Sequence, residues 1–282
     1  MAGRSERRTV GLSVPLLLLT VTGAGAQVAP NRSTQYLFPT DVSDARALWV
    51  NPAGLGLFPE ASIALDATVG DPGAKGRLRQ FTFGFNSRGL SLGYQRDVFD
   101  GGVRGSTLRI GAGFGHRKLA AGGALALYRG GTSSSGWDLG VLYAWTPAIS
   151  VGGTIQDLGE PRVRGELLPV TYVPSATVQL FQGGAALSAL GRVTSVGVVG
   201  YAFGLHAQLR QGTHLPVGLS ARLDTDRSLH RAGFAFGLSL GGQDLAGVVA
   251  TTPGDVSRVD ALSLYGVSTR RFVSSGRPPR MP

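Results

Sequence analysis

Strict alternation between apolar and small or polar residues is the sequence feature that most constrains how this chain folds. Phe81, Phe83 and Phe85, for example, are separated by Thr82 and Gly84. A period of two that is sustained over many residues is the signature of β-strands with one apolar face. The pattern recurs along the chain and predicts about fourteen strands, at 61–69, 78–86, 89–97, 105–115, 118–128, 137–146, 149–157, 171–181, 184–192, 197–210, 215–224, 230–241, 244–252 and 259–272.

The length of these strands indicates a membrane barrel. Strands of soluble proteins average about five or six residues, whereas a tilted strand that crosses a bilayer needs about nine to eleven. Most strands predicted here have about nine to twelve residues, and 197–210 and 259–272 are slightly longer. Because lipid offers backbone groups no hydrogen-bond partners, a sheet placed in it must close on itself. We therefore predict an all-β fold, a transmembrane antiparallel up-and-down β-barrel of about 14 strands with a short N-terminal helical hatch or plug.

The two faces of the predicted strands differ in composition. One face carries Phe, Leu, Val, Tyr and Trp, which suits lipid, and Trp137, Tyr143 and Trp145 lie near strand ends, where aromatic girdles form. The other face is mostly Gly, Ala, Ser and Thr, whereas the outward face of a soluble β-sandwich carries charge. The candidates for lining the lumen are the isolated polar side chains on that small face: Arg109, Asp138, His206, Arg210, Arg222 and Asp224.

Two interpretations of these lumen candidates stay open. The cations Arg109, His206, Arg210 and Arg222 would guide a carboxylate through the lumen. Alternatively, they pair with Asp138 and Asp224 or extend to the barrel rims, as long basic side chains do.

Composition argues against several other functions. The chain has no cysteine, so disulfides and thiolate metal sites are excluded. The net charge is +10, but the basic residues are scattered rather than gathered in a run or helix, so we expect anionic lipid and not nucleic acid as a partner. Its four histidines lie far apart in the sequence, and no nucleophile-elbow pattern occurs. We therefore expect no enzyme, no cofactor and no metal site.

The start of the chain indicates export. Residues 1–26 have the basic start, apolar centre and Ala24-Gly25-Ala26 cleavage site of a secretory signal peptide. We expect a hatch segment at 27–60, the barrel at 61–272 and a C-terminal tail at 273–282. Between strands, tight turns such as 86–89 alternate with longer loops such as 157–168, as in outer-membrane barrels. The predicted location is the outer membrane of a Gram-negative-type bacterium.

The stretch from Asp44 to Gly56 fits neither the leader nor the strands. Residues 45–49 predict a short helical turn that Asp44 would cap. Pro52 pushes the backbone at Asn51 out of the helical region, and Gly54 permits a tight turn. A short helix, a stop and a turn ahead of the strands predict a plug packed against or inside the barrel. An ordinary helix-to-strand connection is the alternative.

Asn51, Pro52 and Ala53, extended by Gly54-Leu55, resemble the hatch motif of the FadL-type outer-membrane transporter superfamily and of the related PorV-type barrels. The resemblance implies a fourteen-stranded barrel behind an N-terminal hatch, with a structural or gating role for Asn51, Pro52, Ala53 and Gly54. For FadL-type proteins it implies passage of fatty-acid- or hydrocarbon-like molecules. The long loops that build their surface-binding groove are missing from this chain.

Two functional hypotheses follow from the resemblance. A barrel that passes hydrophobic compounds would have a hatch that leaves a continuous, mostly apolar path, with a gap or kink in the nearby wall. A PorV-like structural or secretion-associated barrel would have a filled lumen, and its partners would be secretion-machinery proteins.

Overall fold

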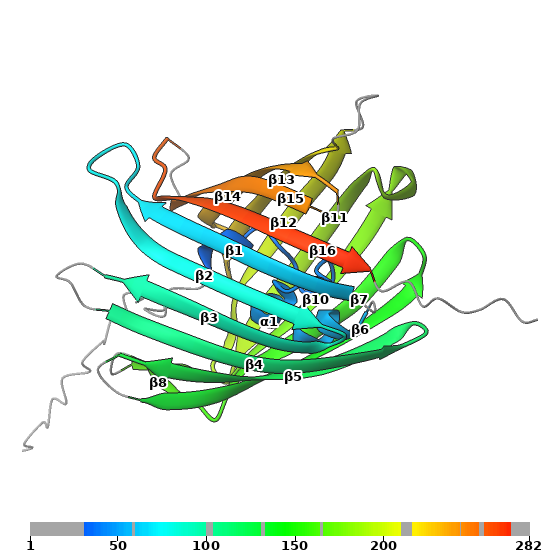
Figure 1. Ribbon diagram of the computed structural model, residues 1–282, viewed down its shortest axis with the longest axis horizontal. Coiled ribbons are helices and arrows are strands. Elements are labelled where there is room, and N and C mark those ends of the chain that lie inside the picture. The colour runs from blue at the N-terminus through cyan, green and yellow to red at the C-terminus, as the bar shows by residue number, and fades with distance from the viewer. Residues whose placement is uncertain are drawn as a thin grey trace, which may run out of the picture.

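The computed structural model describes residues 31–57, 60–99, 104–130, 133–163, 166–209, 216–242, 244–253 and 257–271. These residues form one closed antiparallel β-barrel of fourteen strands, in which β1 pairs with both β2 and β16 (Figure 1). The barrel strands are β1 Glu60–Gly70, β2 Arg77–Ser87, β3 Leu90–Val98, β4 Arg104–His116, β5 Leu119–Arg129, β6 Ser134–Thr146, β7 Ile149–Leu158, β10 Thr171–Leu180, β11 Ala185–Thr194, β12 Gly197–Leu209, β13 Val217–Asp226, β14 Arg231–Gly241, β15 Asp244–Pro253 and β16 Ala261–Arg271.

The strand prediction is confirmed, because all fourteen segments form strands of the closed barrel and most of their ends lie within two residues of the expected ones. One element was not expected. The predicted loop 157–168 contains a small hairpin of β8 (Arg162–Val163) and β9 (Glu166–Leu167), which lies outside the barrel sheet.

The two ends of the barrel differ. We call one the short-turn end, where two-residue connections such as Arg117-Lys118 join β4 to β5 and where the chain enters β1. The opposite end, the loop end, carries the β1–β2 loop and the β8–β9 hairpin and lies on the left of Figure 1. The asymmetry has exceptions, since only Ser195-Val196 separate β11 from β12 at the loop end.

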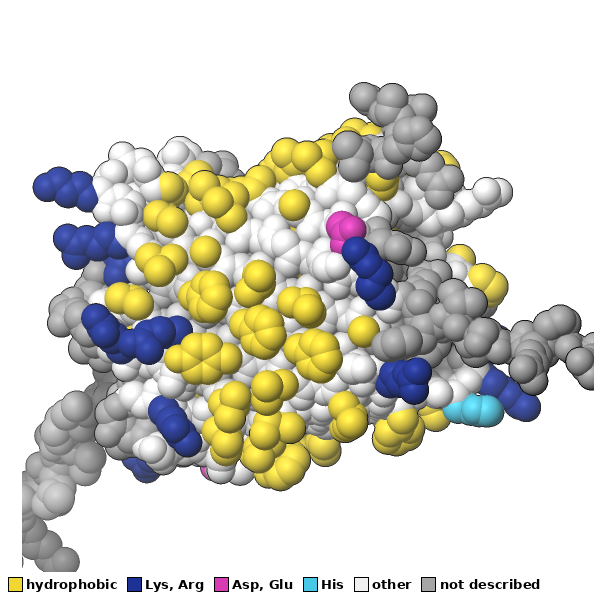
Figure 2. Space-filling model, viewed as in Figure 1, with side chains coloured by type: hydrophobic (Ala, Val, Ile, Leu, Met, Phe, Trp, Pro, Cys, Tyr) yellow, Lys and Arg dark blue, Asp and Glu magenta, His cyan; other side chains and the backbone are white. Residues whose placement is uncertain are grey.

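The outer surface of the barrel wall is apolar. Figure 2 shows hydrophobic side chains across the middle of the barrel, with Lys and Arg near its two ends. Trp137, Tyr143 and Trp145 are 53%, 43% and 63% exposed, as expected for side chains that face outward near strand ends. Exposed apolar side chains that cover a sheet so broadly indicate contact with lipid rather than with water.

The N-terminal segment lies inside the barrel (Figure 1). We call its described residues, 31–57, the plug. It contains the short helices η1 (Arg32–Thr34), α1 (Ala47–Val50) and η2 (Pro52–Gly56). The helix expected at 45–49 thus begins two residues later, and Asp44 accepts a hydrogen bond from the backbone N–H of Arg46 rather than capping α1 from its N-cap position.

Helices of the described residues are all too short or too polar to cross a membrane.

An outward charge near the middle of the wall tests whether this surface contacts lipid. Leu139, in the middle of β6, is 45% exposed, and Leu119, at the short-turn end of β5, is 52% exposed. In lipid vesicles, Leu139→Arg should lower the free energy of unfolding by about 2–4 kcal/mol, whereas Leu119→Arg should lower it by about 0–1 kcal/mol. Urea titration of the two variants measures both values. Equal losses would contradict a lipid-facing wall.

Candidate functional site

Glycines on the inner wall form the surface on which α1 packs. A Cβ at Gly84 or Gly93 would collide with the Trp49 ring, and one at Gly111 would collide with Leu48. Leu48 is fully buried, so the helix touches the backbone of β2, β3 and β4 without space between them. The glycine clusters in these strands therefore serve close packing, as their position in alternating strands predicts.

The turn after α1 packs on the next two strands in the same way. A Cβ at Gly122 in β5 would overlap Pro52, and one at Gly140 in β6 would overlap the side-chain oxygen of Asn51. Ala53 lies in an apolar cluster with Ala120 and Leu142. Both of these wall residues lie close to the short-turn end, so η2 sits where the plug leads into β1.

Asn51 cross-links the plug and is fully buried. Its side-chain N–H donates to the carbonyl of Pro39 at 2.8 Å, and its side-chain oxygen accepts from the N–H of Ala53 at 3.1 Å. A longer contact of 3.4 Å joins the same amide nitrogen to the carbonyl of Val141 in the wall. Asn51 thus stabilises the fold of the plug and its position against β6.

Two largely buried arginines of the wall bind backbone carbonyls of the plug. Arg109 forms an ion pair with Asp138 and donates to the carbonyl of Leu48 at 3.2 Å. Arg222 pairs with Asp224 at 3.0 Å and donates to the carbonyl of Leu37 at 3.0 Å. Because an unpaired charge in such a place costs several kcal/mol, each carboxylate compensates the burial of its arginine.

Arg222 has a second contact with the plug, since its guanidinium lies 5.0 Å from the centre of the Phe38 ring. That ring packs on Gly204, where a Cβ would overlap it, and joins an apolar cluster with Val173 and Leu190. Asp224 also pairs with Arg192 at 3.1 Å, so this carboxylate forms ion pairs with two arginines.

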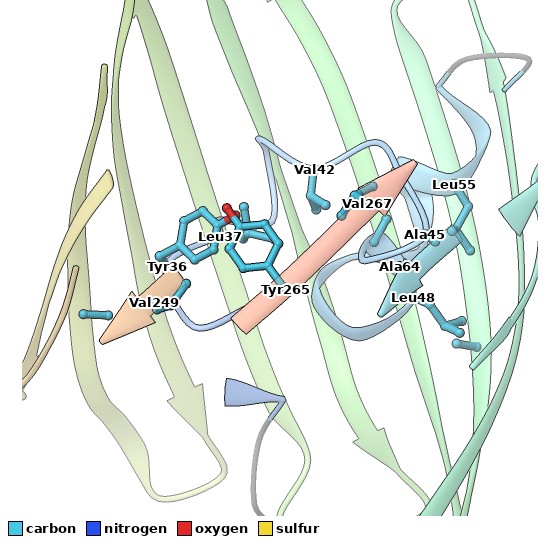
Figure 3. Packing of buried hydrophobic residues seen from close by; sticks show 13 residues of the cluster. Tyr36, Leu37, Val42, Ala45, Leu48, Leu55, Ala64, Val249, Tyr265 and Val267 are labelled. Atoms are coloured by element: carbon cyan, nitrogen blue, oxygen red, sulfur yellow. The ribbon is translucent and has the colours of Figure 1, made fainter. Parts of the chain in front are cut away.

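A third arginine belongs to the plug itself. Arg46 pairs with Asp44 at 2.6 Å and donates to the hydroxyl of Tyr36 at 2.6 Å, and that hydroxyl donates to Tyr265 in β16 at 2.9 Å. Figure 3 shows Tyr36 facing Tyr265 within the large buried cluster that also contains Leu48 and Leu55. Burial alone would raise the pKa of the Asp44 carboxyl, but the Arg46 guanidinium more than offsets this and holds that pKa below its usual value.

On the side of the lumen away from β2 to β6, the plug does not fill the space. A cavity of about 380 Å³ lies between plug residues 36–46 and the wall from β11 to β15, near the short-turn end. His206 lines it and shares a 2.8 Å hydrogen bond with Ser220. Asp41 is exposed to this cavity. The lining is mixed, with Phe38 and Leu245 beside charged and hydroxyl groups, so it differs from the mostly apolar path expected from the resemblance.

The wall has an irregularity, but it does not adjoin this cavity. In β10 and β11, the pair Tyr172–Val193 is followed by the pair Ser175–Leu190, and the described residues between these two pairs are not matched across the strands. Pro174 lies in this interval and lacks a backbone N–H to donate. The interval is in the loop-end half of both strands, whereas the cavity is lined from the short-turn half of β11 by Ser188.

The predicted site residues therefore fall into separate groups. Arg109 with Asp138 and Arg222 with Asp224 lie on different sides of the plug as ion pairs, and His206 lines the cavity together with Asp41 of the plug. Arg210 lies outside the described residues, as do the expected signal peptide and C-terminal tail. Sequence reasoning missed Arg46, Tyr36 and Tyr265, and it expected Asp44 to cap the helix rather than to pair with Arg46. The one available signal was a charged pair, Asp44 and Arg46, beside an otherwise apolar helix.

Among the described residues, no group of three or more His, Asp or Glu side chains is arranged to hold a metal ion.

Comparison with solved structures identifies similar barrels. The chain is similar to the CymD monoaromatic hydrocarbon channel, with 12% identity and a TM-score of 0.50 over 81% of this chain and 93% of that one. It is also similar to a Pseudomonas aeruginosa FadL homologue, with 9% identity and a TM-score of 0.49 over 81% and 93%. The third example is the P. putida toluene transporter TodX, with 12% identity and a TM-score of 0.48 over 81% and 94%.

No protein-family model and no curated protein sequence matches the chain. At these low identities, the likeness to CymD shows a shared barrel fold and does not show a shared substrate.

Enlarging one glycine under the plug tests the packing. Gly140→Ala places a methyl group on the Asn51 amide, whereas Gly233→Ala, also on the inner wall, places one 3.7 Å from its nearest neighbours. We expect Gly140→Ala to speed hydrogen exchange of the 47–56 amides by about tenfold, through the loss of one or two hydrogen bonds of about 1 kcal/mol each. Gly233→Ala should leave exchange unchanged.

Both variants should first be shown to keep a folded, heat-modifiable barrel. Unchanged exchange in folded Gly140→Ala would contradict a plug seated against β6.

Proposed function

We propose that this protein lies in the outer membrane of a Gram-negative-type bacterium and passes hydrophobic small molecules through a lumen that the plug gates. The observation that carries the proposal is the placement of the plug: it covers one side of the lumen and leaves a cavity of about 380 Å³ along the other. The apolar outer wall and the fold shared with a hydrocarbon channel support it.

The two sides of the plug suggest which part moves. The half that contains α1 and η2 lies on glycines and is fully buried at Leu48, Asn51 and Leu55. The half from Tyr36 to Arg46 borders the cavity. It packs on the wall through apolar residues such as Phe38 and is also tied to it by polar contacts. One of these joins Thr40 to Thr177 of β10, with their hydroxyl oxygens 2.7 Å apart. In this proposal the second half shifts to widen the cavity, while the first stays anchored.

The mixed lining of the cavity constrains the cargo. Phe38 and Leu245 offer apolar contact, whereas Asp41 and His206 would stay hydrated or bind a polar group. Although Asp41 faces the cavity, the surrounding barrel separates it from bulk water, and this desolvation raises the pKa of its carboxyl, whereas His206 acts in the opposite direction. A mostly apolar molecule with one polar end would match this lining better than a pure hydrocarbon.

A second candidate function is a PorV-like barrel that binds secretion-machinery proteins and has no transport route. The observation that favours it is the plug's attachment to the wall, since Arg109 and Arg222 each belong to an ion pair of the wall and also donate to a plug carbonyl. A plug that never moves would fill the lumen permanently. The two candidates therefore differ in whether the plug must move.

A reversible lock on the plug separates these candidates. Because the chain has no cysteine, the double variant Thr40→Cys, Thr177→Cys would carry the single disulfide of the protein. The hydroxyl oxygens, whose places the two sulfurs would take, lie 2.7 Å apart, so the two side chains point toward each other as a disulfide requires. In liposomes, uptake of a labelled fatty acid or alkylbenzene should fall to the level of empty liposomes on oxidation and recover on reduction.

The matched control is Thr68→Cys, Ser263→Cys, whose hydroxyl oxygens are also 2.7 Å apart but which joins two wall strands. Its uptake should not depend on oxidation. Equal uptake by locked and reduced Thr40→Cys, Thr177→Cys protein would contradict gating by this part of the plug. No uptake by the folded wild-type protein would contradict passage and favour the partner-binding barrel.

A further inference from the structure

Three arginines gather on the outer face of adjacent strands near the loop end. Arg96 of β3 and Arg129 of β5 both lie opposite Ser106 of β4, and Arg104 of β4 lies two residues nearer the loop end. All three side chains are exposed. Since neighbouring strands are about 4.8 Å apart, the backbones of Arg96 and Arg129 are about 10 Å apart, a gap that two long side chains can close. We call these residues the arginine cluster.

The cluster faces outward, not into the lumen. The residues beside it along the strands, Gln95, Thr107 and Tyr128, are buried on the inner side of the wall. The acid of β3, Asp97, is also buried there and accepts hydrogen bonds from Gln80 and Gln95. Within the described residues, no ion pair is recorded for the arginine cluster, so its positive charge is available at the surface.

Directly beside the cluster, the wall becomes apolar. On the same strands, Leu92 and Ile110 are 43% and 48% exposed and point to the same outer face, and Phe81 of β2 lies opposite Arg96. Figure 2 shows this arrangement, with Lys and Arg side chains at the loop end on the left and hydrophobic side chains next to them. A ligand that fits both surfaces has a negatively charged head and an apolar tail.

The chemistry of arginine indicates which negatively charged head group this surface would bind. A guanidinium binds phosphate oxygens through two parallel N–H donors, and this pairing is stronger than a contact between neutral groups. Three guanidinium groups around one point on β4 could donate hydrogen bonds to several oxygens of one phosphate at the same time. Their stems can lie along the apolar wall while the charged ends reach the head-group layer.

We propose that Arg96, Arg104 and Arg129 form a docking surface for the phosphate groups of an anionic lipid whose acyl chains lie on the adjoining apolar wall. Because longer loops mark the outer side of bacterial barrels, this lipid belongs to the outer leaflet. The surface is separate from the lumen, so its role is to seat the barrel in the membrane and not to carry cargo. It needs only that the barrel spans an outer membrane.

The test compares lipid binding by two charge-matched variants. The first is Arg96→Gln, Arg104→Gln, Arg129→Gln, and the control is Arg227→Gln, Arg231→Gln, Arg258→Gln, which removes the same charge from exposed loop-end positions away from the cluster. Each protein is placed in phosphatidylcholine nanodiscs and titrated with diphosphoryl lipid A, and bound lipid is counted by native mass spectrometry.

We expect the cluster variant to bind diphosphoryl lipid A at least about tenfold more weakly than wild type, and the control to stay within about twofold. The Arg→Lys triple variant at the cluster positions should fall between them, since it keeps the charge and loses the paired donors. Dephosphorylated lipid A should bind wild type and cluster variant alike.

Three results would overturn the proposal. Equal weakening in the cluster variant and the control would show a general effect of charge. Equal binding of phosphorylated and dephosphorylated lipid by wild type would remove the role of phosphate. Competition by inorganic phosphate at the same concentration as the lipid would show an anion site without lipid preference. A heat-modifiability gel on every variant confirms that the compared proteins are folded barrels.

Discussion

The structure depends on closure of the strand ladder. A sheet in lipid cannot leave backbone N–H and C=O groups at an open edge, because each unpaired group would cost several kcal/mol. The chain meets this constraint by pairing its first and last strands, from Glu60 with Arg271 to Gly70 with Ala261. Closure with fourteen strands has a consequence, since a ring of this size encloses more space than wall side chains can fill. The plug follows from that excess, and both candidate functions depend on how firmly the plug is held.

Two kinds of contact hold the plug, and they have different sequence requirements. Against β2 to β6 the wall is lined with glycine, so the plug approaches the backbone directly and is held by close packing. On both sides of the lumen, charged groups such as Arg109 and Arg222 also bind its carbonyls, while a carboxylate compensates their burial. Packing of the first kind cannot change gradually, whereas hydrogen bonds of the second kind can be exchanged for water. We assign movement to the half of the plug that borders the cavity, because open space lies beside it there.

The fold was predictable because a period of two is a local property of the sequence, and strands nine to thirteen residues long repeat it clearly. The site was predictable only in part. That Arg109 and Arg222 face inward follows from the same alternation, but the carbonyls they bind, of Leu48 and Leu37, depend on the path of the plug through the lumen. The contact of Arg46 with Tyr36 and Tyr265 joins residues more than two hundred positions apart, so no local pattern indicates it. The inward glycines of β2 to β6 were visible in the sequence, yet only the structure shows that together they mark where the plug lies.

The central claim is that the stretch around Trp49 lies inside a barrel whose outer wall contacts lipid. The chain's three tryptophans test it directly, because Trp49 packs on the inner wall while Trp137 and Trp145 are exposed outside. Fluorescence is measured for the protein in vesicles with brominated acyl chains, beside a Trp137→Phe, Trp145→Phe variant that keeps only Trp49. Strong quenching of the wild-type protein and little quenching of the variant is the predicted result. Quenching of Trp49 by brominated lipid to the same extent as the other two would contradict the account.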